Sequence, residues 1–181
     1  MARLTPLWTA QPLTDDAAIA DFLGARGVAF ERWELPAHVS AIAAQDTVTD
    51  ADKQALLDAF SAKLAAVADG TPYKSADVVA IRPHLPGVDG ALARFDRVHR
   101  HDDDEIRAIV GGRGIFGFLD DVGRQYLLLI EAGEYISVPA GAWHWFYCDD
   151  TKNITALRIF KDAAGWVAHY RDEAAAGGSP A

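Results

Sequence analysis

The chain contains a single cysteine, Cys148, among its 181 residues. One thiol cannot form an intrachain disulfide or a multi-cysteine zinc or iron–sulfur site, so we expect a reducing compartment. The sequence has no apolar run of the ~18 residues that a membrane-spanning helix requires. Its N-terminus also lacks the basic start and apolar centre of a signal peptide. We therefore expect a cytoplasmic protein with no membrane partner.

Basic residues are scarce, with 17 Lys and Arg against 26 Asp and Glu and a net charge of −9. Binding to nucleic acid needs a surplus of cations to neutralise phosphates, so nucleic acid is not expected as a partner. Half of the residues are hydrophobic, which is enough for a packed core. We expect residues 1–181 to form one domain and the protein to be a monomer.

Hydrophobic spacing divides the chain near residue 75. Before it, Thr14 is expected to cap a helix carrying Ile19, and Thr49 to open a longer helix that ends near Gly70. Residues 28–35 resemble a strand. The part from about 76 to 170 has the turn-separated pattern of a small barrel or sandwich, and residues 172–181 are expected to be a flexible tail. The predicted strands are 77–82, 92–98, 105–110, 114–118, 125–130, 135–138, 143–147 and 154–160.

Residues with metal-binding chemistry cluster in two segments. In residues 95–107, alternation along a strand predicts that Phe95, Arg97, His99 and His101 share one face, with a turn at 102–104 before Glu105 and Arg107. Two imidazoles and a carboxylate on one side of a barrel would form a facial set of metal ligands.

The second segment adds a fourth ligand. Pro139 and Gly141 mark a turn that places His144 at the start of a strand, with Phe146 on the same face. The predicted metal ligands are therefore His99, His101, Glu105 and His144. Lone histidines are more often surface or hydrogen-bonded core residues, and we interpret His38, His84 and His169 in that way. Residues 102–104 fit a solvated turn.

The same segments resemble the two cupin motifs. Residues 99–112 fit His-x-His-x3-Glu-x6-Gly, and residues 133–144 fit Gly-x5-Pro-x-Gly-x2-His. Ala93 and Cys148 stand where the motifs usually have glycine and asparagine, but neither is a ligand position. Three strings are similar to the acireductone dioxygenase family over about residues 75–170. They are HRHDDDEIRAIVGGRGIFGF, YISVPAGAWHWF and ITALRIFKDAAGWVAHY.

The resemblance implies a mainly β cupin fold, a double-stranded β-helix (jelly-roll) barrel with a few peripheral α-helices, mostly from the N-terminal part. It also implies one Fe2+ or Ni2+ per chain and a role in methionine salvage. With Fe2+ the family splits acireductone, 1,2-dihydroxy-3-keto-5-methylthiopentene, with O2 to formate and 4-methylthio-2-oxobutanoate. With Ni2+ the products are formate, carbon monoxide and 3-methylthiopropanoate.

The family pattern also suggests roles for residues around the metal. Arg107 is expected to hold the substrate dianion, and Arg158 is a weaker candidate for a second cation. A solvated ion pair is the alternative for Arg107. Packing in the core is the alternative for the expected pocket wall of Phe95, Phe146 and Trp166. Val98 and Asp104 occupy positions where the family is suggested to influence metal uptake or conformational change.

Two other function classes stay open at this stage. The first is a different metal-dependent cupin enzyme, such as another dioxygenase or a sugar-phosphate isomerase. An isomerase of that kind would want a basic cluster for phosphate, whereas the chain has only five lysines. The second is a non-catalytic cupin that binds a metal or a small molecule. Dependence on O2 is the observation that would discriminate between these two classes.

Overall fold

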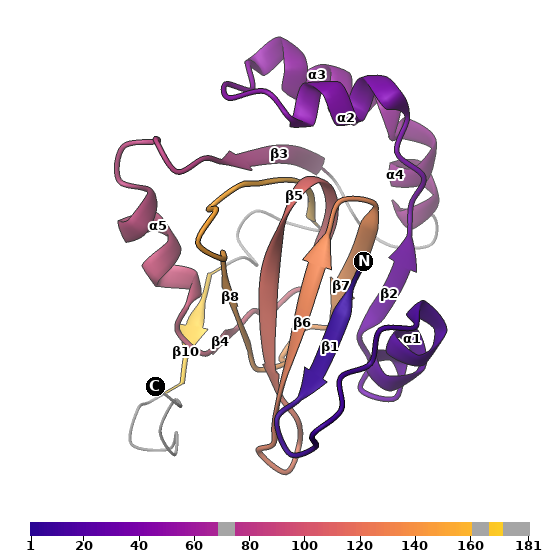
Figure 1. The fold of residues 1–181 in the computed structure, drawn as a ribbon, viewed down its shortest axis with the longest axis vertical. Coiled ribbons are helices and arrows are strands. Elements are labelled where there is room, and N and C mark those ends of the chain that lie inside the picture. Colours follow the sequence, from indigo (N-terminus) through magenta and orange to yellow (C-terminus); the bar gives the residue numbers. More distant parts are fainter. Residues whose placement is uncertain (69–74, 161–166, 172–181) are drawn as a thin grey trace.

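The computed structural model describes residues 1–68, 75–160 and 167–171. Its strands form a β-barrel built from two antiparallel layers that share one long strand, β5 (Glu105–Leu119) (Figure 1). One layer has the order β1 (Arg3–Pro6), β6 (Gln125–Glu131), β5, β8 (His144–Tyr147), β4 (His99–Arg100) and β10 (His169–Tyr170). In the other, β5 lies between β7 (Glu134–Val138) and β9 (Ile154–Phe160), which pair with β2 (Ala29–Arg32) and β3 (Ser75–Ile81).

Strand β5 passes from one layer to the other at a pair of glycines. Its register against β9 shifts between Ile109 and Gly111, and Gly112 has a φ of 69°. A Cβ at Gly112 would collide with the Asn153 carbonyl, so only glycine fits here. The irregularity bends β5 so that its two halves can pair with different strands.

The same irregularity changes which side chains of β5 face the barrel interior. Before it, Ile106, Ala108 and Val110 pack in the cluster under the helices, whereas Ile109 belongs to the other cluster. After it, Phe116 and Phe118 belong to the same cluster as Ile109. The inward positions are thus odd-numbered before Gly111 and even-numbered after Gly112. Glu105 and Arg107 are odd-numbered positions in the first half of β5, so their side chains face the barrel interior.

Helices cover two sides of the barrel (Figure 1). They are α1 (Asp16–Gly24), α2 (Ala37–Ala43), α3 (Asp50–Ala59), α4 (Ser61–Ala68) and α5 (Val88–Phe95). Val39 of α2, Leu56 of α3 and Phe60 pack with Ile106 of β5 in one buried cluster. Arg82 ties these layers together, because its buried guanidinium donates to backbone carbonyls of the α2 end and of β9.

The prediction of a mainly β cupin barrel with outer helices is confirmed, and so is the helix beginning at Thr49. Thr49 and Asp52 form a reciprocal capping box, but the helix breaks at Phe60 into α3 and α4. The first helix is capped by Asp15 and not by Thr14. The predicted strands 105–110 and 114–118 are two parts of β5. The predicted stop at Gly70 lies outside the described residues.

The predicted strand 92–98 is wrong. Gly87, with a φ of 73°, precedes a helix over Val88–Phe95, where Ala91, Leu92 and Arg94 are strong helix formers. Phe95 therefore ends α5 and does not share a strand face with His99 and His101. Trp166 and the predicted flexible tail 172–181 lie outside the described residues. In the described ranges, no helix is long and apolar enough to cross a membrane.

Candidate metal centre

Four side chains from two segments of the chain meet inside the barrel: His99, His101, Glu105 and His144. One ligand atom from each lies within 4.8 Å of those of the others. His99 of β4 and His144 of β8 are directly opposite each other across the two strands, and Glu105 begins β5. Each of the four side chains belongs to a residue that is at most 5% exposed. The structure thus brings together the four residues that the sequence selected.

Each histidine of the cluster holds its Nδ1 against a backbone carbonyl. The pairs are His99 with Arg97 at 2.7 Å, His101 with Val167 at 3.3 Å, and His144 with Ala142 at 2.9 Å. A carbonyl oxygen can only accept, so we assign the proton to Nδ1 in each ring. Each Nε2 then presents a lone pair to the cluster, in the orientation that a metal ligand requires. The sequence did not reveal these carbonyl partners.

The cluster fits a divalent transition metal. The Nε2 of His99 is buried and has no hydrogen-bond partner among the described residues. Nε2 atoms of His101 and His144 each lie 3.1 Å from the same oxygen, Oε2 of Glu105. Since these Nε2 atoms carry lone pairs, the short approaches are those of ligands converging on one centre. Imidazoles and a carboxylate suit ions such as iron and nickel.

Protonation also favours metal binding. Burial, with the neighbouring His144 imidazole, lowers the pKa of His99 to about 4, so this ring is neutral at neutral pH. Burial alone would raise the pKa of Glu105, but the Arg107 guanidinium, together with the contacts to His101 and His144, holds that pKa well below the usual range. Arg107 Nη2 lies 3.0 Å from Glu105 Oε1. A cation therefore meets an ionised carboxylate and a neutral imidazole without prior loss of a proton.

A row of charged side chains crosses three neighbouring strands beside the cluster. Arg107 is directly opposite Arg158 on β9, which is directly opposite Asp77 on β3. Asp77 accepts two hydrogen bonds from Arg158, at 2.6 and 2.5 Å, and so partly neutralises the second arginine. Burial lowers the pKa of Arg107 to about 10, which leaves it cationic at neutral pH. The site thus keeps a positive charge next to Glu105.

A small cavity of about 70 Å³ lies beside Glu105, Arg107 and Arg158. Phe95 and Phe146, both predicted from the sequence, line it. The sequence reasoning missed its remaining walls, although alternation in the strands 77–82 and 154–160 carried the signal. These walls are Val79, Ile81, Ile109, Phe116, Ile154 and Ala156. The lining is largely apolar around one charged end.

Val98 and Asp104 both hold loops that lead to ligands. The Val98 carbonyl accepts a hydrogen bond from the backbone of Arg171, at 3.0 Å. Asp104 Oδ1 accepts from the backbone of Ala140 at 3.0 Å, which ties the turn before Glu105 to the loop before His144.

The other histidines stand apart from the cluster. Neither His38 nor His84 is in it, and His169 contacts Asp102 at 2.9 Å. Burial raises the pKa of the Cys148 thiol to about 11, which makes it a poor nucleophile at neutral pH.

A two-layered β-barrel that gathers three histidines and one glutamate in its interior defines a metal-binding cupin. Within this class, the chain belongs to the ARD/ARD' family, whose family model matches residues 24–168. An acireductone dioxygenase of Picosynechococcus is 40% identical over 170 residues, covering 94% of this chain and 92% of that protein. One of Leptospira interrogans is 35% identical over 162 residues, covering 90% and 91%.

The same relationship is found among solved structures. Acireductone dioxygenase from Bacillus anthracis, with a cadmium ion in its active centre, superposes with a TM-score of 0.87 at 34% identity. The match covers 94% of this chain and 98% of that one. A related protein of the same fold therefore holds a metal in its active centre.

Proposed function

We propose that the protein is an acireductone dioxygenase of methionine salvage. Its substrates are 1,2-dihydroxy-3-keto-5-methylthiopentene and O2. With Fe2+ the products are formate and 4-methylthio-2-oxobutanoate, and with Ni2+ they are formate, carbon monoxide and 3-methylthiopropanoate. The observation that carries the proposal is the buried cluster of three histidines and Glu105 with the cationic Arg107 beside it. Membership of the ARD/ARD' family supports it.

In this proposal His99, His101, Glu105 and His144 hold one Fe2+ or Ni2+. The bound ion supplies a Lewis acid and a template for the two adjacent oxygens of the enediol. The four residues contribute one negative charge in total, since the three imidazoles bind as neutral rings. Their Nδ1 contacts with carbonyls keep the rings in place while substrate enters and product leaves.

Arg107 is proposed to favour the dianion of the substrate. An acidic enediol loses protons more readily beside a fixed cation, and a guanidinium can donate two parallel hydrogen bonds. The buried position of Arg107 strengthens this interaction because little water screens it. Arg158 would add positive potential, reduced by its two hydrogen bonds with Asp77.

Phe95 and Phe146 are proposed to form the apolar wall around the methylthio tail. The wall would exclude water from the reacting oxygens. Trp166 is proposed for the same wall from the family pattern. We also propose that Val98 and Asp104 influence metal uptake through the loops that they hold.

The chain is further proposed to act in the cytoplasm as a monomer, with residues 1–181 as one domain. This domain would combine a helical part up to about residue 75 with a metal-binding barrel over about 76–170. Sedimentation of the metal-loaded protein over a range of concentrations tests the monomer, which a concentration-dependent increase in mass would exclude.

The decisive experiment measures O2 uptake and identifies products on protein reconstituted with Fe2+ and, separately, with Ni2+. We expect stoichiometric O2 uptake above the autoxidation of acireductone, with formate in both cases and carbon monoxide only with Ni2+. Free metal ion without protein is the control. Protein with one tightly bound metal but no uptake above this control would reject the dioxygenase and leave a metal cupin with another substrate or a binding role.

A further inference from the structure

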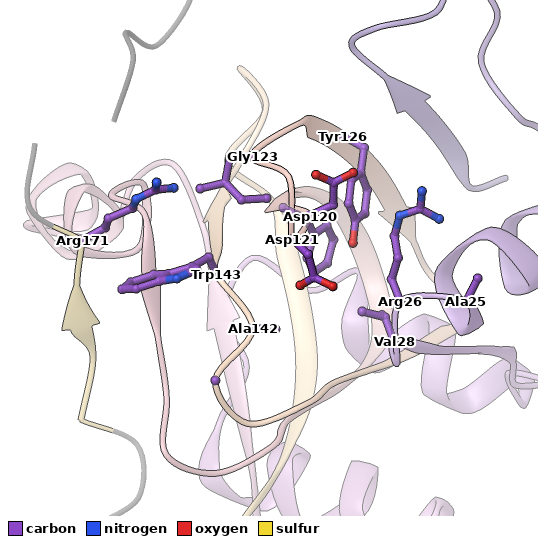
Figure 2. A pocket seen from close by; sticks show the side chains of 13 residues that line it. Ala25, Arg26, Val28, Asp120, Asp121, Gly123, Tyr126, Ala142, Trp143 and Arg171 are labelled. Atoms are coloured by element: carbon purple, nitrogen blue, oxygen red, sulfur yellow. The ribbon is translucent and has the colours of Figure 1, made fainter. Parts of the chain in front are cut away.

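A second cavity, of about 410 Å³, lies outside the metal centre (Figure 2). Figure 2 shows Trp143 and Arg171 on one side of it, Arg26 and Tyr126 on the other, and Asp121 between them. Phe118 separates this cavity from the cluster, because its ring stacks on Tyr126 and lies 6.5 Å from the His144 ring. The volume falls within the ~300–1,000 Å³ of small-molecule sites. Nothing in the proposed reaction uses it.

Tyr126 lines this cavity, and the residue as a whole is 2% exposed. Its ring is held by Phe118, with centroids 4.9 Å apart and an interplanar angle of 14°. Burial raises the pKa of Tyr126 to about 12, so the hydroxyl stays protonated and can donate. The hydroxyl is thus a donor on the wall of the cavity, fixed in place by the ring stack.

Charges of both signs line the same cavity. The Arg26 guanidinium lies 3.7 Å from the centre of the Phe22 ring, and its Nη1 donates to the Phe22 carbonyl at 2.8 Å. This leaves further donors of Arg26 for another acceptor. On the negative side, Asp120 is occupied by the turn that follows it, through hydrogen bonds from the backbone of Val122 and from Arg124.

Asp121 is the negative group that remains available. In the part of the chain that the structure describes, it makes no hydrogen bond or ion pair, and it is exposed. A neighbouring cavity is also lined by Arg26 and Asp121, so both groups face open space that continues beyond the 410 Å³ cavity. Both charges act on the pKa of Tyr126, Arg26 lowering it and Asp121 raising it, so both groups lie near its hydroxyl.

We propose that this cavity is a binding site for a small zwitterion with the head group of an α-amino acid. The carboxylate would accept from Arg26 and from the Tyr126 hydroxyl, and the ammonium would pair with Asp121. An anion without an ammonium group would lie near the like charge of Asp121, and an amine without a carboxylate would lie near the like charge of Arg26. The Trp143 ring provides an apolar surface for the side chain. The site does not depend on the dioxygenase function.

The test is calorimetric titration of the metal-loaded protein with free L-amino acids, one at a time. The matching 2-oxo acids, which lack the ammonium, and primary amines, which lack the carboxylate, are titrated in parallel. We expect saturable binding of at least one amino acid and at least about tenfold weaker binding of its 2-oxo acid and amine, equal to ~1.4 kcal/mol. No saturable binding by any amino acid, or equal binding of the 2-oxo acid, would overturn the proposal.

Variants distinguish this cavity from chelation of the bound metal by the amino acid. Tyr126→Phe keeps the ring stack, while Arg26→Gln and Asp121→Asn remove one charge each. We expect each to weaken binding about tenfold or more. Arg3→Gln and Asp21→Asn change the same charges at exposed positions outside the cavity and should have no effect. If binding persists unchanged in all three cavity variants, the amino acid binds elsewhere and the proposal is wrong.

Discussion

Backbone carbonyls orient all three histidines of the candidate metal centre. Because Arg97, Val167 and Ala142 provide these carbonyls, substituting their side chains leaves the acceptors in place. The four ligand side chains differ, because the main chain cannot replace a lost imidazole or carboxylate. Metal binding should therefore respond sharply to changes at the ligands and weakly to conservative changes at the three carbonyl residues.

Removing a ligand should remove the metal. We expect His101→Ala and His144→Ala to lose bound metal and activity together, by more than the ~10–100-fold typical of an outer contact. Metal content by elemental analysis after gel filtration, with activity measured on the same samples, checks this. His38→Ala is the matched control because His38 is not in the cluster. A His38→Ala protein without metal would show that the ligand set is wrong.

Replacing Arg107 should separate metal binding from turnover. We expect Arg107→Met to keep the metal and to lower kcat by on the order of 10²–10³, the effect typical of removing a donor to developing negative charge. Stopped-flow O2 consumption and elemental analysis give the two readouts. Arg113→Met changes an exposed arginine of the same strand and should leave both values unchanged. Equal loss of metal in Arg107→Met would contradict the substrate-binding role.

At the scale of elements, β5 connects the fold with the site. Its first half brings Glu105 and Arg107 to the interior, and its second half accepts the aromatic rings of β8. Gly114 makes room for the Phe146 ring, and Gly117 makes room for the Trp145 ring. The glycines of β5 therefore decide how closely the strand that carries His144 can approach.

Adding a methyl group at Gly117 should test this close approach. We expect Gly117→Ala to lower the free energy of unfolding by ~1–3 kcal/mol, because the new Cβ would collide with the Trp145 ring. Urea denaturation followed by tryptophan fluorescence measures the change. Gly90→Ala is the matched control: Gly90 lies within α5 with no atom near its missing Cβ, and the substitution should stabilise by ~0.4–1 kcal/mol. Equal stabilisation by both substitutions would refute the argument.

The capping box of α3 gives a pH dependence with a definite sign. Hydrogen bonds from the Thr49 side chain and backbone lower the pKa of Asp52. Its contribution is present above the unfolded pKa of ~3.9 and is lost as the pH falls through the lower folded value. We expect Asp52→Ala to lower the melting temperature at neutral pH, with the difference from the original protein shrinking in acid. A difference independent of pH would indicate that the carboxylate charge plays no part.

Some of the elements and of the site could be predicted from the sequence, and others could not. The four clustered residues stand in two short motifs, and local signals predicted the helix at Thr49. The opposition of Asp77 and Arg158 depends on the register between β3 and β9, which no local pattern specifies. The parity change at Gly111 and Gly112 likewise depends on the partner strand. The alternating pattern around Phe95 predicted a strand, but the strong helix formers before it place Phe95 at the end of α5.

At the scale of the whole molecule, the fold has two hydrophobic clusters that do not depend on the metal. One contains Phe116, Leu128 and Ile154, and the other joins the helices to Ile106 and Leu157. The candidate metal centre adds four buried polar residues to this apolar frame. The frame should therefore persist without metal, while a metal that binds only the folded state adds stability that grows with the logarithm of its concentration over its Kd.

Removing the metal should lower the melting temperature without unfolding the barrel. A ligand at a thousandfold excess over its Kd stabilises the folded state by about 4 kcal/mol, and chelation removes this contribution. Circular dichroism before and after EDTA treatment and dialysis checks both parts of the prediction. Restoring Fe2+ should restore the original melting temperature. Loss of the β-sheet signal on chelation at room temperature would show that the metal is needed for folding.

Because the inward-facing positions of β5 change from odd to even numbers at Gly111 and Gly112, the number of residues in this strand is constrained. An insertion or deletion of one residue between Arg107 and Gly111 would turn either the charged pair Glu105 and Arg107, or the hydrophobic residues that follow, toward the wrong side. Loops between strands can change length without this conflict. The number of residues from Glu105 to Phe118 therefore constrains how the sequence can diverge. A change in this spacing would alter the metal centre or the hydrophobic core.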